Sequence, residues 1–359
     1  MLRVGMLTSG GDCQALNATM RGAAKALYKM EKDVEIIGFK DGYKGLIYSD
    51  YEVMKPEQFS GLLTRGGTIL GTSRQPFKQM QVIGEDGLDK VAAMKNTYKK
   101  LKLDCLVVLG GNGSQKTANL LSKEGLNIIG LPKTIDNDLY QTDITFGFYS
   151  AVRVATNAID DIHTTAASHG RIFIVEVMGH KVGWLTLYAG IAGGADLILI
   201  PEIPYDIGVV SEAIMERTRQ GKKFSIIAIA EGAISKEDAK LGKKELKEKI
   251  KSRKYPSVAY ELAAKIEEMT GQEVRVTVPG HMQRGGIPSS TDRVISTRIG
   301  AKCAEMIGEK DFGKMVAVRG EELVGVPLSE IAGKLKTVDP KASIIREARL
   351  VGINFGDVL

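Results

Sequence analysis

Two short segments of this chain decide its fold: a glycine-rich turn, Leu109-Gly110-Gly111-Asn112-Gly113-Ser114, and a carboxylate-rich loop, Pro132-Lys133-Thr134-Ile135-Asp136-Asn137-Asp138. Each follows an apolar, strand-like run. Glycines let the backbone approach an anion closely, and a helix beginning at such a turn offers free N–H groups. Two carboxylates at alternate positions of an extended loop can point the same way. One can take a hydroxyl proton while the other helps to hold Mg²⁺, so together the segments indicate phosphoryl transfer.

Runs rich in β-branched residues alternate with longer segments of helical periodicity along the chain. This alternation predicts an α/β fold in which mostly parallel sheets are covered by helices. We expect helices over 17–30, capped by Asn17, and over 114–123. We expect nine strands, too many for one small sheet, at 3–8, 34–39, 105–110, 127–131, 172–178, 196–201, 225–231, 274–278 and 315–318.

The unusual residues of the sequence gather at the carboxyl ends of these expected strands. Besides the two opening segments, they are Gly10-Gly11-Asp12, Met178-Gly179-His180, Glu231 and Gly280-His281. In open α/β sheets that edge carries the ligand. With 359 residues, the chain is long enough for two domains. The sequence therefore predicts one or two ligand clefts.

Composition excludes several classes of protein. The net charge is +6, but the basic residues are dispersed and aromatic residues are only 6% of the chain, which disfavours nucleic-acid binding. The lysine-rich stretch 236–254 is interleaved with acidic residues, as on a solvated helix. Three separated cysteines and the spacing of the histidines indicate neither a disulfide framework nor a zinc site. We expect a cytoplasmic protein, because no signal-like or membrane-spanning segment is present in the sequence.

Further polar motifs have both a functional and a plain interpretation. The segment 65–74 offers glycine turns and Arg74, which suits a phosphate, although a lone surface arginine is usually solvated. His281-Met282-Gln283-Arg284-Gly285-Gly286 brings an imidazole, an amide and a guanidinium together, as a sugar phosphate would require or as a polar turn would allow. The Asp-Asn-Asp segment and the glycine turn are each, taken alone, also compatible with ordinary turns.

Taken together and in order, these motifs resemble the phosphofructokinase family over nearly the whole chain. The matching segments are Leu7-Thr8-Ser9-Gly10-Gly11-Asp12, Asp41-Gly42-Tyr43-Lys44-Gly45-Leu46, 65–74, 110–114, 132–138, Val175-Glu176-Val177-Met178-Gly179, Ile191-Ala192-Gly193-Gly194 and 280–286. The resemblance implies two Rossmann-like, three-layer α/β domains with the active site in the cleft between them. The donor domain would comprise 1–147 and about 283–333, and the sugar-phosphate domain 148–282 and about 334–359.

The family's reaction transfers a phosphoryl group from a magnesium-bound donor to the 1-hydroxyl of fructose 6-phosphate in glycolysis. By motif, Asp136 resembles the base, Thr134 and Asp138 line the same site, and Arg74 stabilises charge on the moving group. The resemblance places Gly11, Tyr43, Arg74, Gly110, Gly111, Asn112, Gly113 and Ser114 on the donor side, with Asn112 and Asp138 as the metal residues. It places Met178, Gly179, His180, Glu231, His281 and Arg284 on the sugar-phosphate side. Arg171 and Arg275 match arginines that reach a neighbouring subunit's site, which implies a homo-oligomer, a tetramer in the family.

Three positions depart from the family's best-known bacterial ATP-dependent pattern. Asn112 replaces a magnesium-associated aspartate, His180 replaces an arginine, and Lys133 replaces a glycine. In pyrophosphate-using relatives, an aspartate stands at the position of Gly113 and a lysine at that of Lys133. Gly113 therefore favours ATP, whereas Lys133 also allows pyrophosphate, a combination that resembles the family's mixed-substrate group.

The sequence alone also allows other interpretations. Asn112 and His180 would also suit an inactive regulatory paralogue, against which the intact Thr134, Asp136 and Asp138 argue. Sedoheptulose 7-phosphate is an alternative acceptor. Arg21 and Lys25 lie where some family members bind a regulatory ligand, although solvated helix charges explain them as well.

Overall fold

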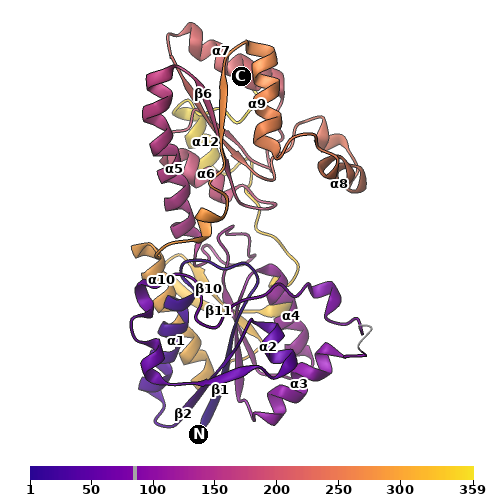
Figure 1. The fold of residues 1–359 in the computed structure, drawn as a ribbon. Coiled ribbons are helices and arrows are strands. Elements are labelled where there is room, and N and C mark those ends of the chain that lie inside the picture. The colour runs from indigo at the N-terminus through magenta and orange to yellow at the C-terminus, as the bar shows by residue number, and fades with distance from the viewer. Residues whose placement is uncertain (84–86) are drawn as a thin grey trace. The chain divides into compact units, whose positions relative to one another are not determined.

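The computed structural model describes residues 1–83 and 87–359 (Figure 1). The chain forms two compact units, and each is built from two separate stretches of sequence. Unit 1 comprises Met1–Ser150 and Arg284–Lys336, and unit 2 comprises Ala151–Gln283 and Thr337–Leu359.

Unit 1 is built on a seven-stranded sheet in the order β11-β10-β5-β4-β1-β2-β3. Its five inner strands run parallel, and the two edge strands, β3 and β11, are antiparallel to their neighbours. All six residues of β4 are buried, as in a parallel sheet covered on both faces. The strands are β1 (Leu2–Ser9), β2 (Val34–Phe39), β3 (Tyr51–Met54), β4 (Cys105–Gly110), β5 (Ile128–Pro132), β10 (Lys314–Arg319) and β11 (Glu322–Pro327).

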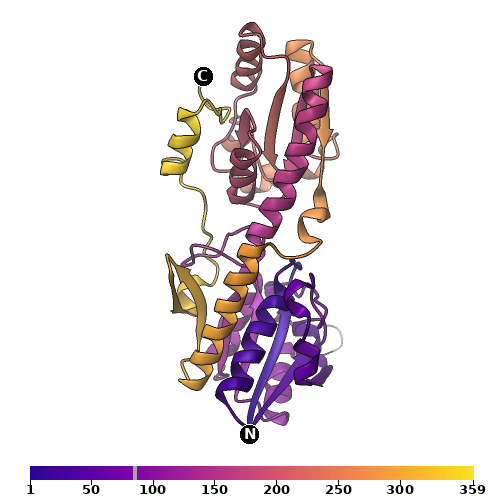
Figure 2. The same ribbon diagram turned by 90° about the vertical axis from the view of Figure 1, so that its left-hand side faces the viewer.

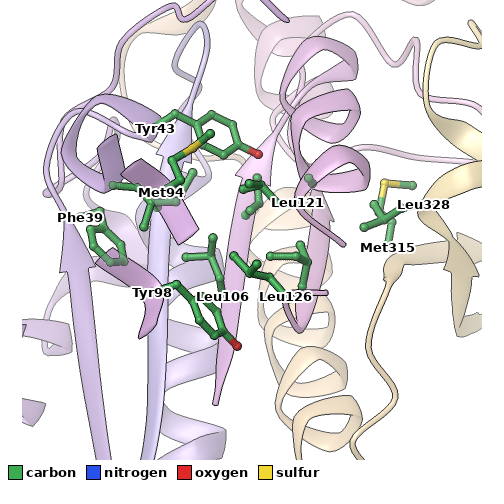
Figure 3. Packing of buried hydrophobic residues seen from close by; sticks show 14 of the residues in the cluster. Phe39, Tyr43, Met94, Tyr98, Leu106, Leu121, Leu126, Met315 and Leu328 are labelled. Carbon is green, nitrogen blue, oxygen red and sulfur yellow. The ribbon is translucent and has the colours of Figure 1, made fainter. Parts of the chain in front are cut away.

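Helices cover both faces of this sheet. Helices α1 (Leu16–Met30) and α10 (Ser290–Gly308) lie alongside each other on one face (Figure 2). Their contact is so close that a Cβ on Gly300 would lie 2.4 Å from the Ala23 nitrogen, which only glycine avoids. The other face packs on α2 (Tyr43–Tyr48), α3 (Lys90–Lys100), α4 (Asn112–Lys123) and α11 (Leu328–Ile331) through the apolar cluster of Figure 3, which includes Phe39, Leu106 and Leu121. Short 3₁₀ turns occur at Pro56–Phe59, Leu62–Thr64 and Phe77–Gln79.

Unit 2 is built on a four-stranded parallel sheet in the order β7-β8-β6-β9. The strands are β6 (Ile172–Val177), β7 (Leu197–Leu199), β8 (Ser225–Ala230) and β9 (Val274–Thr277). Aliphatic side chains of the sheet pack with those of two helices, α7 (Ile207–Arg219) and α9 (Val258–Thr270). The remaining helices are α5 (Phe148–His169), α6 (Trp184–Ala192), α8 (Lys243–Lys251) and α12 (Ser343–Leu350), with 3₁₀ turns at Asp238–Lys240 and Gly280–Arg284.

All nine expected strands are present, with ends that differ by a residue or two. The expected cap on the first helix is wrong: the helix begins at Leu16 after Ala15, and Asn17 lies buried inside it. Its side-chain amide instead donates to the Arg65 and Gly66 carbonyls and accepts from the Ile69 N–H. The helix expected over 114–123 begins two residues earlier, at Asn112, directly after the glycine turn.

The lysine-rich stretch contains α8, which has no buried residue and stands apart from the sheet of unit 2 (Figure 1). Within residues 1–83 and 87–359, no helix combines the length and the apolar character that crossing a membrane requires.

Candidate active site

Three polar segments meet at one edge of the unit 1 sheet. Parallel pairing places Ser9 beside Gly110, and Gly110 beside Pro132, at the carboxyl ends of β1, β4 and β5. The loops that follow these residues are 10–12, 111–114 and 133–138. They therefore leave the sheet side by side, at the edge where α/β proteins bind ligands.

The glycine turn is built around Gly110. A Cβ on Gly110 would lie 2.2 Å from the Cβ of Ser114, so any other residue would push α4 away from β4. Gly111 caps α4, and Asn112 begins it. The Tyr43 hydroxyl, which is fully buried, supports this first turn from behind by donating to the Ser114 carbonyl at 2.8 Å. The turn is therefore fixed before any anion binds to it.

Gly113 faces open space. No atom of the described residues lies within 4 Å of where its Cβ would be, and the residue is exposed. A larger side chain fits here sterically, so the glycine is not required by packing. Because Gly113 has no side chain, there is open space beside the start of α4.

The carboxylate loop is held by its own side chains. The Asp136 N–H donates to Thr134 Oγ1 at 3.0 Å. Asn137, which has a positive φ of 52°, accepts from the Thr145 N–H at 3.0 Å. Burial raises the pKa of Asp138 above its ordinary value, against the opposing effects of a backbone hydrogen bond and the charges of Lys133 and Lys336.

Two basic side chains, Lys133 and Arg284, donate hydrogen bonds to backbone carbonyls of the 10–12 loop. Lys133 is buried, and its ammonium donates to the Gly11 carbonyl. Burial lowers the pKa of Lys133, and the positive charge of Arg284 adds to this effect. The Arg284 guanidinium donates to the Asp12 carbonyl at 2.9 Å. Arg284, which stays protonated, therefore places a positive charge next to the 10–12 loop.

Arg74 is exposed on a loop that is tied to the same place. The Gly10 N–H donates to the Ser73 carbonyl at 3.1 Å, and Thr72 Oγ1 donates to the Gly10 carbonyl at 2.7 Å. These bonds bring the residue preceding Arg74 against the 10–12 loop.

Asn112 and Asp138 are the residues that the family resemblance suggests for a metal ion, and both carry side-chain oxygens. Both are attached to residues 334–336: Asn112 Nδ2 donates to the Lys334 carbonyl at 2.6 Å, and the Lys336 N–H donates to the Asp138 carbonyl at 2.9 Å. Among the described residues, no group of three or more His, Cys, Asp or Glu side chains could hold a metal by itself. A pair of oxygen ligands suits Mg²⁺, which keeps several waters and is completed by substrate phosphates.

Unit 2 has a second polar edge, at the carboxyl ends of β6 and β8. Glu231, which follows β8, is exposed and accepts hydrogen bonds from the N–H groups of Gly179 (3.3 Å) and His180 (2.7 Å). His180 has a positive φ of 53° and an exposed side chain. The Met178 N–H donates to Oε1 of the buried Gln283 at 3.1 Å. His281 is exposed, on the 3₁₀ turn that contains Gln283.

Arg171 and Arg275 are not brought to this edge of unit 2. Arg171 precedes β6, and Arg275 lies in β9 where that strand pairs with the start of β6. Both guanidiniums form ion pairs with Glu273, Arg171 through Nε at 2.5 Å. Met178 follows the other end of β6, about 20 Å away for a strand of this length.

Some residues of these edges carry no signal that identifies them from sequence. Gln283 lies in a recognisable motif, but its bond to the Met178 backbone cannot be inferred from the motif. Glu202 accepts from the N–H groups of Gly183 and Val338, at 3.0 and 2.9 Å, and so joins the start of α6 to a segment far along the chain. Lys336 stands in no motif at all.

Comparison with known proteins identifies relatives over almost the full length. The family model described as "Phosphofructokinase" matches residues 3–307. The "ATP-dependent 6-phosphofructokinase" of Spirochaeta thermophila is 55% identical over 356 residues, covering 98% of this chain and 97% of that protein. The "ATP-dependent 6-phosphofructokinase 3" of Bacteroides thetaiotaomicron is 46% identical over 356 residues, covering 99% of this chain and 100% of that protein.

A solved structure supports the same relationship. The structure of phosphofructokinase from Saccharomyces cerevisiae matches with a TM-score of 0.79 at 29% sequence identity. The match covers 92% of this chain and 45% of the yeast chain, so this chain spans less than half of the yeast chain's length.

Proposed function

This chain belongs to the phosphofructokinase family, and we propose that it transfers the terminal phosphoryl group of Mg-ATP to the 1-hydroxyl of fructose 6-phosphate, giving fructose 1,6-bisphosphate in glycolysis. Its relatives at 44–55% identity are named ATP-dependent 6-phosphofructokinases over nearly their full length, which supports this activity and ATP as donor. The observation that carries the proposal is the register that brings Ser9, Gly110 and Pro132 together at one sheet edge.

The donor phosphates would bind at the glycine turn. The first turn of α4 offers N–H groups and the positive end of the helix dipole, and Gly110, Gly111 and Ser114 fix its position. Tyr43 supports the turn through its hydrogen bond to the Ser114 carbonyl, and Gly11 lies in the neighbouring 10–12 loop. Arg74, exposed on its tethered loop, would stabilise the charge that develops on the moving phosphoryl group.

The acceptor hydroxyl would be activated by Asp136. Thr134 fixes the Asp136 backbone, so the carboxylate has a defined position from which to take the 1-hydroxyl proton. Asn112 and Asp138 would hold Mg²⁺, which when bound neutralises the charge of the donor phosphates.

The sugar phosphate would be recognised by Met178, Gly179, His180, Glu231, His281 and Arg284. Arg171 and Arg275 lie at the opposite end of β6 from Met178. That placement supports their use in the site of a second copy of this chain, and hence a homo-oligomer, a tetramer as the resemblance implies. We also propose a cytoplasmic location, where the enzyme would meet both of its substrates.

Pyrophosphate is the second candidate donor, and Lys133 is the observation that favours it. In this structure, however, the Lys133 ammonium already donates to the Gly11 carbonyl. Gly113 leaves open space next to the turn, where the rest of a nucleotide can extend. We therefore place ATP first.

The test is an assay of the full chain with fructose 6-phosphate and Mg²⁺, comparing ATP with pyrophosphate. We expect turnover with ATP. Gly113→Asp should suppress the rate with ATP by crowding the nucleotide, whereas Gly113→Ala, which fits the open space, should retain it. An inactive wild-type chain with both donors would refute the enzyme and favour a regulatory paralogue. An unchanged ATP rate in Gly113→Asp would remove the argument about the donor.

A further inference from the structure

Residues 334–336 form the last segment of unit 1 before the chain enters unit 2. We call these residues the strap. The Lys334 carbonyl accepts from Asn112 Nδ2 at 2.6 Å, and the Lys336 N–H donates to the Asp138 carbonyl at 2.9 Å. Between these two contacts, Leu335 forms an isolated antiparallel bridge with Leu139. The strap is therefore bonded to both residues of the proposed magnesium site.

The bond from Asn112 requires an amide. Its nitrogen donates to the strap, which leaves the oxygen of the same group free of that contact and able to face a metal ion. An aspartate here has no N–H and would turn a carboxylate oxygen toward the Lys334 carbonyl. This chain's departure from the usual aspartate thus coincides with the presence of the strap contact.

The side chain of Lys336 fixes the other end of the strap. Its ammonium donates to the carbonyls of Thr142 (2.9 Å) and Asp143 (2.7 Å). That loop is itself joined to β10, because the Asp143 N–H donates to the Val318 carbonyl at 2.8 Å and the Val318 N–H donates to Thr142 Oγ1 at 3.0 Å. A partly buried ammonium that donates to two carbonyls is a strong local fastener.

We propose that Lys336 is a positioning residue that fastens the strap to the sheet and so sets the positions of Asn112 and Asp138 for Mg²⁺. The inference rests on the proposed function, which makes these two residues the metal site. It adds a residue outside every recognised motif to that site. An ammonium has no lone pair with which to ligate a metal ion, so Lys336 would act through the strap.

The experiment compares Lys336→Met with Lys336→Arg and Lys334→Met in the full chain. Hydrogen–deuterium exchange without ligands reports whether the strap is fastened. We expect exchange in residues 334–338 and 138–143 to rise roughly tenfold in Lys336→Met. Lys336→Arg keeps a cation and its donors and should restore much of the protection. Lys334→Met is the matched control, since it removes only a cation over the Tyr140 ring, 5.4 Å from its centroid, and keeps the backbone contacts.

A second measurement asks whether the strap acts on the metal. With a non-hydrolysable ATP analogue present, Mg²⁺ should protect residues 110–114 and 133–138 from exchange. The Mg²⁺ concentration that gives half of this protection should rise roughly tenfold or more in Lys336→Met, as for other residues that orient metal ligands. The Mg²⁺ requirement for turnover should rise with it, while KM for fructose 6-phosphate stays near the wild-type value.

Two results would overturn the inference. Unchanged exchange in Lys336→Met would show that the ammonium does not fasten the strap. Faster exchange with an unchanged Mg²⁺ midpoint would show a purely structural role. Failure of the proposed function is a separate outcome, namely a wild-type chain without turnover, and the exchange measurements still decide the role of Lys336 in that case.

Discussion

The two polar sheet edges of this molecule differ in how firmly their groups are held. At the unit 1 edge, Lys133, Thr134 and Asn137 are buried and bonded to neighbouring loops. At the unit 2 edge, His180, Glu231 and His281 are exposed. Chemistry on a phosphoryl group needs preorganised groups, whereas recognition of a sugar phosphate can use side chains that are ordered by the ligand. The difference matches the roles that we propose for the two units.

The largest effect should come from the group assigned to the chemistry itself. Asp136→Asn should lower kcat by about 10²–10⁴-fold, because an amide cannot take the hydroxyl proton. Binding of both substrates and the midpoint of thermal unfolding should change little. Steady-state kinetics and calorimetry check this, and Asp50→Asn, at an exposed position, serves as a control. A kcat within tenfold of the wild type would mean that another group is the base.

The next effect concerns the rigidity of the unit 1 edge. Gly110→Ala places a Cβ 2.2 Å from the Ser114 Cβ and should lower the free energy of unfolding by about 1–3 kcal/mol. Gly113→Ala meets nothing within 4 Å and should change it by less than about 0.5 kcal/mol. Urea denaturation of both variants measures the contrast. Equal stabilities would show that the turn adapts easily and is not fixed.

At the unit 2 edge, Glu231→Gln should act on substrate binding. A neutral side chain accepts less strongly from the Gly179 and His180 N–H groups, so the 178–180 loop should be less well placed for the sugar. We expect KM for fructose 6-phosphate to rise about tenfold, or about 1.4 kcal/mol, with kcat nearly unchanged. Glu212→Gln, in an exposed ion pair of the same unit, is the control. A fall in kcat at constant KM would contradict the proposed division between the two edges.

The smallest effect is a pH dependence in unit 2. Burial raises the pKa of Glu202 above its ordinary value of 4.5, although three backbone hydrogen bonds oppose the shift. The folded chain therefore retains this proton where the unfolded chain has lost it. The free energy of unfolding falls as the pH rises from 4.5 through the raised pKa, and it falls no further beyond that.

Glu202→Gln does not titrate and should remove this fall. The difference from the wild type should be at most about 1 kcal/mol, because the group is partly exposed. Urea denaturation at several pH values from 4.5 to neutrality measures it. Parallel curves for the two proteins would show that Glu202 titrates normally.

The sequence predicts the inner strands well because a strand buried on both faces must be apolar throughout, as 105–110 shows. The edge strands β3 and β11 are not predicted, because they are not buried on both faces. Their exposed or half-buried residues alternate without a continuous apolar run, and they pair antiparallel at the rim of the sheet.

The candidate site is predictable only as far as its motifs extend. Asn17 illustrates the limit, because a polar residue before an apolar helix suggests a cap, yet here its amide holds a loop some fifty residues away. Lys336 and Glu202 act through backbone carbonyls and N–H groups. Every residue type has such groups, so no sequence pattern reveals these contacts.

The packing of α1 against α10 has a consequence for how the chain is made. Gly300 reaches α1 only after residues 151–283 have left the ribosome, and β10 and β11 follow later still. The N-terminal stretch therefore has only α1 on one face of its sheet, without α10, while the whole central stretch is synthesised. Chaperone dependence and aggregation during translation should accordingly concentrate in residues 1–150, although these include the buried Lys133, Thr134 and Asn137 of the proposed catalytic edge.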